Sequence, residues 1–358
     1  MGRKHVKPTL VAFVTIFLSY KLWVEFSQVD FERHFESLGI GESNDFLEAS
    51  PSRSSFNIFK DKPETTNRTH CNVIDLDSPN EHEFKCIMMK SQPPVPVCLY
   101  DIFMDMYISD NLESAGVWEE YIVAEVGDLL RRDPDLHFID AGANIGVYTL
   151  YAAKLGRRVV AVEPFMDNVL RLQKAAQLGG LTKQITLINN AIADVRSGAK
   201  IIRSSNNQGD TRIVLGAVGN CIGDCAASIN TVYLDDLLEL TTFTKAIIKI
   251  DIQGYEHLAF RHAEKLLDKI DVKYIFMEWL VMRELYHSQS DRDKELVEDM
   301  MKLLLRRDFK PYCLEVHGGR ELDVSDWPKW PVDIVWKKLL NKKEYSKLLQ
   351  NHFKNWPR

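Results

Sequence analysis

The sequence has no block of like charge. Its 45 lysine and arginine residues and 51 aspartate and glutamate residues are interspersed along the chain, and the formal net charge is −6. A protein that binds nucleic acid usually carries a basic patch or stripe. We therefore expect no nucleic-acid partner.

Cysteine is scarce and lacks the spacing of a zinc site. The chain contains no paired C-x-x-C units, which are typical of structural zinc sites. An even number of cysteines permits disulfides in an oxidising compartment, but six allow fifteen pairings, and the sequence does not choose among them. Buried thiols are the alternative. The six are Cys71, Cys86, Cys98, Cys221, Cys225 and Cys313, of which Cys221 and Cys225 are close enough to close one loop.

An apolar run, short for a spanning helix, occurs near the N-terminus. Three basic residues precede residues 9–26, a stretch interrupted by Lys21, whose long side chain can snorkel to the membrane surface. We predict a signal anchor over residues 9–26. Because the basic flank comes first, the positive-inside rule puts residues 1–8 in the cytosol and the rest in the lumen. This topology predicts a single-pass type II membrane protein of the Golgi or endoplasmic reticulum. A cleaved signal peptide and a buried soluble helix are the alternatives, although no clean small-x-small cleavage site follows the run.

The segments after the anchor differ in composition. Residues 27–70 mix Ser, Asn, Glu and Pro without periodicity, which predicts a flexible stem. Asn67-Arg-Thr69 within the stem is a glycosylation acceptor, in agreement with a lumenal position. Residues 71–130 are predicted to be an extension that packs on the core, which spans residues 131–358. An amphipathic helix is expected over residues 117–130, and several acids nearby could border a site or form a solvated helix face: Asp110, Glu113, Glu119 and Glu120.

The first glycine-rich turn of the core lacks the spacing of a dinucleotide site. Residues 138–140 are predicted to be a buried strand and residues 145–155 a helix, and the turn between them has glycine at positions 142 and 146. This G-x-x-x-G spacing differs from the G-x-G-x-x-G that seats a pyrophosphate on a helix N-terminus. Asp140 at the turn entrance would repel a diphosphate. It suits a ligand with ammonium and sulfonium charges, such as S-adenosylmethionine.

An acid follows the next predicted strand. Residues 158–162 end at Glu163, about twenty residues after the first glycine, where an acid can accept hydrogen bonds from both hydroxyls of a ribose. The alternative is that the two glycines only shape a turn and Glu163 is a solvated strand end.

From residue 137 onward, predicted strands and helices alternate. This order predicts an α/β fold with a Rossmann-like sheet, helices on both faces and a ligand at the carboxyl ends of the strands. The predicted strands are 137–140, 158–163, 184–190, 246–251, 272–278, 310–315 and 332–337, and the predicted helices are 145–155, 166–178, 255–268 and 292–307.

A second apolar strand, residues 246–251, also ends in acids. Asp251 lies at its end, and Glu256 and His257 open the next predicted helix. Lys249 is a charge within the apolar strand, so we expect it to reach a partner at an end or edge. With Glu278 after the following strand, several carboxylates meet at one edge of the sheet, which solvation alone explains poorly.

Five segments resemble, in order, the FkbM-type methyltransferases. The segments are FIDAGANIGVYT, VVAVEP, NNAIAD, VYLDDLL and IKIDIQGYE, and the likeness spans roughly residues 117 to 337. It implies a class I methyltransferase fold with a seven-stranded sheet whose last strand is antiparallel, S-adenosylmethionine as cofactor, and methylation of a hydroxyl, often on a sugar. The likeness also implies where the cofactor lies: Asp140, Gly142, Asn144 and Gly146 at the methionine part, Glu163 at the ribose, and Ala191 and Ile192 near the adenine.

The chain departs from that family at one position. The family often has an acid where this chain has Gln253. If that acid served the chemistry, Gln253 cannot replace it as a base.

Methyl transfer to an alcohol is an in-line displacement, so the protein must align the two reactants and help to remove a proton. Our catalytic candidates are Asp251, Glu256, Glu278 and His257. Helix capping, packing or a salt bridge is the alternative for each. Acidic clustering would also suit a divalent cation, but no ligand spacing supports one, and we assign no metal ligand.

The sequence thus predicts a membrane-anchored O-methyltransferase that acts on a glycan or another hydroxyl acceptor. A first alternative is an NAD-dependent oxidoreductase, which the glycine spacing opposes. A second is a lumenal scaffold or receptor on a degenerate methyltransferase fold. A third keeps the activity but changes the acceptor to lipid or protein.

Overall fold

The computed structural model describes residues 70–203, 207–208, 211–215, 225–287, 290–314 and 319–339. The predicted cytosolic segment, the anchor and the glycosylation acceptor lie outside these residues, as does nearly all of the stem. Among the described residues, no helix has the length and apolar character needed to cross a bilayer.

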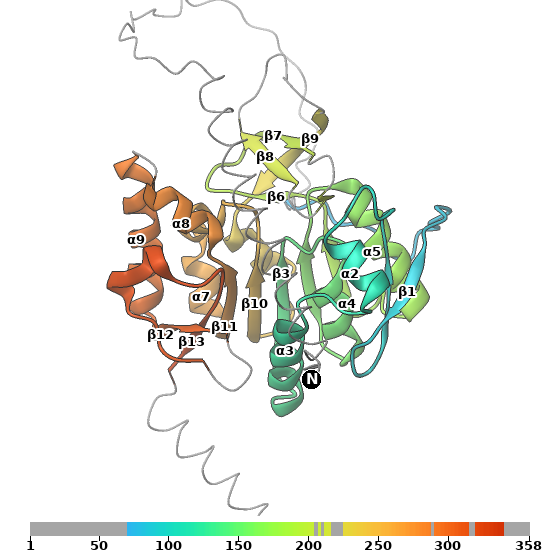
Figure 1. Ribbon diagram of the computed structural model, residues 1–358, viewed down its shortest axis with the longest axis horizontal. Coiled ribbons are helices and arrows are strands. Elements are labelled where there is room, and N and C mark those ends of the chain that lie inside the picture. Colours follow the sequence, from blue (N-terminus) through green and yellow to red (C-terminus); the bar gives the residue numbers. More distant parts are fainter. Residues whose placement is uncertain are drawn as a thin grey trace, which may run out of the picture. The chain divides into compact units, whose positions relative to one another are not determined.

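Within the described residues, seven strands form one mixed sheet in the order β12-β13-β11-β10-β3-β4-β5 (Figure 1). β13 runs antiparallel to β11 and β12, whereas β11, β10, β3, β4 and β5 pair in parallel. The predicted α/β fold and its antiparallel last strand are therefore confirmed. The bounds are β3 His137–Ala141, β4 Val159–Val162, β5 Ile185–Ile188, β10 Lys245–Ile250, β11 Asp271–Glu278, β12 Phe309–Cys313 and β13 Asp333–Lys338.

Side chains of the strands alternate between two buried clusters, one on each face of the sheet. In β3, Phe138 belongs to one cluster and Ile139 to the other, as the period of two along a strand requires. The first cluster also contains residues of α3 Glu120–Arg132, α4 Val147–Lys154 and α5 Met166–Gly179. The second contains residues of the 3-10 helix η2 Leu234–Glu239, α7 Glu264–Lys269 and α9 Asp291–Leu305. Helices thus cover both faces, as predicted.

The helix predicted over residues 255–268 is divided into three pieces. They are α6 Glu256–Ala259, the 3-10 helix η3 Phe260–His262 and α7. Ala263, between η3 and α7, has φ −124° and so lies far from helical geometry. Phe260 and Ala263 are both buried in the second cluster, which indicates that packing against the sheet overrides a continuous helix.

Several elements lie outside the predicted ones. A hairpin of β1 Cys86–Met89 and β2 Val95–Cys98 is closed by the disulfide Cys86–Cys98. Cys221 lies outside the described residues. A small four-stranded sheet has the order β6-β9-β7-β8. Its strands, and two further helices, are β6 Ala191–Ile192, β7 Gly198–Ile202, β8 Arg212–Leu215, β9 Cys225–Val232, α2 Ile108–Ser114 and α8 Leu280–His287.

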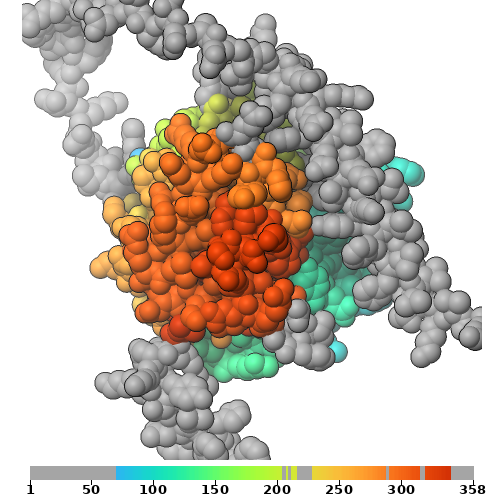
Figure 2. Space-filling view, turned by 60° about the vertical axis from the view of Figure 1, so that its left-hand side comes forward, coloured from blue at the N-terminus to red at the C-terminus, as the bar shows by residue number. Residues whose placement is uncertain are grey.

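The C-terminal part of the chain gathers at one end of the large sheet. In Figure 2, residues coloured orange to red form one continuous face over α8, α9 and the last strands. In this part of the chain, the buried Trp279 lies 4.7 Å from Trp330 between ring centroids and also contacts Trp327 edge to face. The 3-10 helix η4 Val324–Lys329 thereby packs on the end of β11, and this end of the sheet is closed by aromatic packing.

Candidate active site

A pocket opens at the carboxyl ends of β3, β4 and β10. Its empty space is about 830 Å³, a volume that includes space open to solvent. Residues after each of these strands line it, together with Trp118 and Glu119 just before α3 and with Ala191 and Ile192 of β6. Its position agrees with the rule that α/β sheets bind ligands outside the carboxyl ends of parallel strands.

The glycine turn after β3 touches the turn after β10. Gly142 has φ +87°, and a Cβ atom there would lie 1.8 Å from the carbonyl oxygen of Asp251. Only glycine permits both this backbone conformation and this approach. Gly146 has φ +93°, and a Cβ would lie 2.7 Å from Leu172, so its role is to pack α4 on α5. Gly142 and Asn144 line the pocket, whereas Gly146 lies behind it.

Glu163 lies at the pocket and holds the neighbouring turn. Its Oε2 accepts a hydrogen bond from the Asn144 amide at 2.8 Å, and its Oε1 accepts from the Phe165 amide and from Asn168 Nδ2. Burial raises the pKa of Glu163 to about 7, although these three donors oppose the shift. A carboxylate offers about four acceptor positions. The geometry therefore leaves roughly one position for a ribose hydroxyl, where the sequence predicted two bonds.

Asp140 lies behind the glycine turn. It is almost completely buried, and its Oδ2 accepts a hydrogen bond from Thr149 at 2.6 Å. Its Oδ1 has no hydrogen-bond partner within the described chain, and burial raises its pKa to about 6. Asp140 does not line the pocket. It can therefore act on a ligand only by its charge or by supporting the glycine turn.

Backbone strain gathers at this pocket. Among the described residues, four non-glycine residues have positive φ, and three of them line the pocket: Glu119 at 44°, Asn144 at 51° and Gln253 at 54°. Such conformations cost about 1 to 3 kcal/mol each and persist only where the surroundings fix them. Their clustering is typical of a functional site.

Lys249 lies at the other end of the pocket and forms an ion pair there. Its Nζ lies 3.0 Å from Asp251 Oδ2 and 4.8 Å from the centre of the Tyr148 ring. The expectation that Lys249 reaches a partner is confirmed. Burial would lower the pKa of Lys249, but the carboxylates of Asp251, Glu119 and Asp140 outweigh burial and raise it. The ammonium is therefore permanently charged at physiological pH.

Gln253 supports Asp251 from the opposite side. Its Nε2 donates to Asp251 Oδ1 at 2.9 Å, while Lys249 donates to Oδ2. Both oxygens of Asp251 thus already accept a bond from the chain. An acid at position 253 could not donate in this way, so the departure from the family pattern changes what holds Asp251.

Of the four predicted catalytic residues, only Asp251 lines the pocket. Glu256 accepts hydrogen bonds from the Ile252 and Gly254 amides at 2.8 and 3.0 Å, so it clamps its own turn, and burial raises its pKa to about 7. His257 is buried and does not line the pocket. Burial lowers its pKa to about 4.

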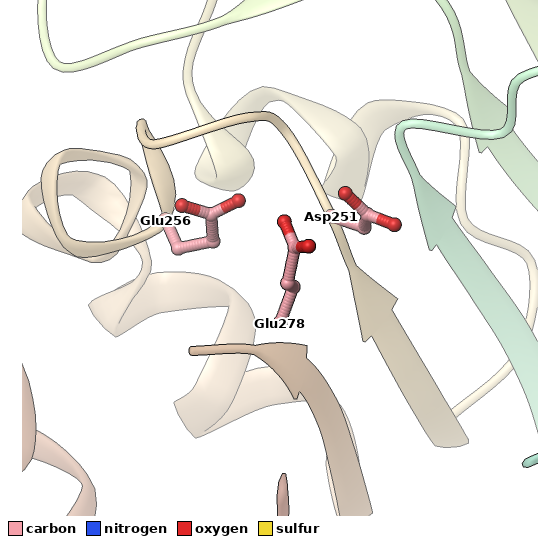
Figure 3. A group of neighbouring side chains, drawn as sticks. All are labelled: Asp251, Glu256 and Glu278. Atoms are coloured by element: carbon pink, nitrogen blue, oxygen red, sulfur yellow. The ribbon is translucent and has the colours of Figure 1, made fainter. Parts of the chain in front are cut away.

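Glu278 rises from the end of β11 between Glu256 and Asp251 (Figure 3). Each of the three offers one oxygen, and these oxygens lie within 4.8 Å of one another, close enough to hold a metal ion. However, Glu256 already accepts two amide bonds and Asp251 is paired with Lys249. Burial and the neighbouring carboxylates raise the pKa of Glu278, which favours its protonated form. The donor set therefore suits a proton-sharing cluster better than a divalent cation.

Two side chains of the site were not among the predicted site residues. Glu119 was one of four acids expected either to border a site or to form a solvated helix face; it lines the pocket and accepts a hydrogen bond from the Tyr148 hydroxyl. Tyr148 lies one residue into α4 and carried no signal beyond an apolar position. Their approach depends on how α3 packs against α4, which no local pattern reveals.

The match to a protein family agrees with this geometry. Residues 140–311 match the family model described as Methyltransferase FkbM domain. The likeness read from the five sequence segments is therefore confirmed over these residues. Glu119 and Tyr121 precede the matched region.

Solved structures resemble the chain at low identity. The FkbM methyltransferase from Methylobacillus flagellatus KT is 17% identical, with a TM-score of 0.35, and the match covers 66% of this chain and 56% of that one. An O-methyltransferase from Bacillus cereus in complex with SAH is 12% identical, with a TM-score of 0.36 and coverage of 64% and 86%. TomG from Streptomyces achromogenes, in complex with SAM, is 8% identical, with a TM-score of 0.36 and coverage of 62% and 82%.

These likenesses add no argument about function. The chain spans only 56% of the Methylobacillus protein, and no curated protein matches it. The assignment to the fold of class I methyltransferases rests on the strand order and on the single antiparallel strand.

Proposed function

We propose that the protein is an S-adenosylmethionine-dependent O-methyltransferase that acts on a hydroxyl group of a glycan or another acceptor of the secretory pathway. One observation carries the proposal. A single pocket joins the glycine turn and Glu163 at one end to the Lys249 and Asp251 pair at the other. One end has the features of a nucleoside site, and the other has charged groups that can orient a hydroxyl.

The residues present at the first end fit the cofactor. Asn144 and Gly142 would lie along its methionine part, Glu163 would accept from its ribose, and Ala191 and Ile192 would flank its adenine. Around the pocket as a whole, the carboxylates of Asp140, Glu119 and Asp251 outnumber the single ammonium of Lys249. This excess of negative charge suits a ligand that bears a sulfonium and an ammonium group. When bound, S-adenosylmethionine supplies the methyl group.

At the second end, the protein aligns the acceptor and excludes water. Asp251, held from both sides by Lys249 and Gln253, presents a fixed carboxylate to a hydroxyl. Trp118 and Ile252 contribute apolar surface to the lining of the pocket. Fixed donors and acceptors convert binding energy into orientation, which is the main requirement of an in-line displacement.

The cellular setting that we propose is lumenal. An apolar run with a basic flank at residues 9–26 and the acceptor at Asn67 support a type II membrane protein. The Cys86–Cys98 disulfide supports an oxidising compartment. The Golgi and the endoplasmic reticulum both satisfy these conditions.

The experiment is a calorimetric titration of the full chain with S-adenosylmethionine and, separately, with NAD, followed by transfer of a labelled methyl group to a panel of glycans. We expect micromolar binding of the first ligand, none of the second, and label in the glycan fraction. Label in the lipid or protein fraction would show that the acceptor is a lipid or a protein and not a glycan. If a folded chain binds neither ligand, a degenerate scaffold would be favoured. The observation that supports this second candidate is Gln253, which stands where the family often has an acid.

A further inference from the structure

Glu119 brings an acid into the pocket from outside the FkbM domain. It is the residue just before α3, with φ 44° and ψ 50°. One contact holds the Glu119 side chain, and a second, made two residues later, anchors the first turn of α3. The Tyr148 hydroxyl of α4 donates to Glu119 Oε2, and the Tyr121 hydroxyl of α3 donates to Asp333 at the start of β13. A glutamate is therefore held in a left-handed conformation by groups on two other elements, which is costly unless the position serves a purpose.

The other titratable side chains that line the pocket are already engaged. Besides Glu119, they are Tyr148, Glu163, Lys249 and Asp251. Glu163 accepts from three protein donors at the cofactor end. Asp251 accepts on both oxygens, and Lys249 is the cation that binds it.

Glu119 is engaged on one side only. Tyr148 donates to its Oε2, and within the described part of the chain its Oε1 accepts no hydrogen bond. An acceptor oxygen without a donor, on a carboxylate that lines the pocket, can take a proton from a ligand that enters there.

We propose that Glu119 is the general base for the acceptor hydroxyl. The inference rests on the proposed function. In the step, the hydroxyl oxygen bonds to the methyl carbon while the bond between that carbon and the sulfonium sulfur breaks, and its electron pair stays on sulfur as a neutral thioether. The hydroxyl proton passes to Glu119 Oε1 and then to solvent. Asp251 is a positioning residue that holds Lys249 beside the developing negative charge on oxygen.

The electrostatic surroundings of Glu119 fit this role. Burial raises its pKa to about 7; Lys249 of β10 opposes the shift, Asp333 of β13 and Asp251 add to it, and the Tyr148 hydrogen bond of α4 opposes it. A base works best when its pKa lies near the working pH.

The first test compares Glu119→Gln with Glu120→Gln in the full chain. Gln retains an oxygen for the Tyr148 hydroxyl but cannot take a proton. With the acceptor identified by labelled methyl transfer, we expect Glu119→Gln to lower kcat about 10²- to 10⁴-fold and to leave the Kd for S-adenosylmethionine within threefold. It should also remove the acid limb of the pH–rate profile. Glu120 is exposed and serves as the matched control, with unchanged kcat.

The second test needs no acceptor. The full chain is labelled with ¹³C at glutamate side-chain carboxyls for NMR spectroscopy. The resonance that is absent from Glu119→Gln belongs to Glu119, and its chemical shift is followed as the pH is changed. A midpoint near 7 supports the assignment. A midpoint below about 5, the range of an ordinary glutamate, overturns it even if the variant is inactive, because loss of activity would then reflect structure.

The outcomes separate this inference from the proposed function. An active wild type with an equally active Glu119→Gln variant overturns the base assignment and leaves the methyltransferase standing. A folded wild type that transfers no methyl group to any acceptor class overturns both.

Discussion

Glu163 and Glu256 perform the same task at two turns of the sheet, yet only one of them faces the pocket. Each accepts two backbone amide bonds at a strand-to-helix turn, and burial raises the pKa of each to about 7. Glu163 reaches across to Asn144 in the turn of the neighbouring strand and so lies at the pocket. Glu256 closes its own turn, at Ile252 and Gly254, and lies behind it. An acid near a strand end is therefore not a site residue by position alone.

The contact between the turn after β3 and the turn after β10 should be the most sensitive point of the site. Gly142→Ala would put a Cβ 1.8 Å from the Asp251 carbonyl at a backbone φ of +87°. We expect a loss of about 3 kcal/mol or more in the free energy of unfolding, measured by urea denaturation, and no calorimetric signal with S-adenosylmethionine.

The matched control is Gly156→Ala. Its φ is +79°, but a Cβ there meets no atom within 4 Å. We expect a loss of about 1 kcal/mol and normal cofactor binding. Equal losses in the two variants would show that backbone conformation, and not the contact between the turns, makes Gly142 essential.

The raised pKa of Glu256 predicts a dependence of stability on pH. Its folded-state pKa of about 7 lies above 4.5, the pKa of an unperturbed glutamate. The stability that it contributes is therefore fully present below pH 4.5 and is lost as the pH rises through 7. Glu256→Gln cannot lose a proton. As the pH rises from 4 to 8, the wild type should therefore lose up to about 3 kcal/mol of unfolding free energy relative to Glu256→Gln.

Denaturation curves at several pH values measure this difference. Glu264→Gln, on the exposed side of α7, controls for the change in net charge. A constant difference between wild type and Glu256→Gln across the range would mean that Glu256 is not held in its protonated form.

The smallest expected effect is on cofactor affinity, and it distinguishes Glu163 from Glu256. Glu163→Gln removes one of the oxygens that bind the Asn144, Phe165 and Asn168 donors, so the glycine turn loses a support beside the ligand. We expect about fivefold weaker binding of S-adenosylmethionine, since one such hydrogen bond contributes about 1 kcal/mol. Glu256→Gln should change this affinity less than twofold. Calorimetry of both variants at pH 7 measures the contrast, and equal affinities would remove Glu163 from the cofactor site.

The sheet could be predicted because its signals are local. Apolar runs such as residues 246–251 identify parallel strands, and each of the seven predicted strands overlaps an observed one. The break after α6 could not be predicted, because packing of Phe260 against the sheet overrides a helical pattern. The hairpin of β1 and β2 also escaped prediction, since its strands are only four residues long and β2 contains proline.

The candidate site was predicted less completely. The turn at Gly142 and the acid at Glu163 are separated by a fixed βα unit, so their spacing in sequence indicates their proximity in space. Glu256 and Glu278 follow equally good strands, but the direction of each carboxyl depends on which amides or neighbours it meets. Their catalytic roles stay predictions, and the pocket gives Asp251 alone a direct place.

The sequence by itself determined the fold class, the FkbM likeness and the edge of the sheet at which the site lies, because strand period, glycine spacing and strand-end polarity are properties of short segments. Only the tertiary structure decided which charges meet. Lys249 pairs with Asp251, and Glu119 reaches Tyr148 from 29 residues away. The second of these contacts arises from the packing of α3 and α4 on one face of the sheet, and burial raises the pKa of Glu119 there.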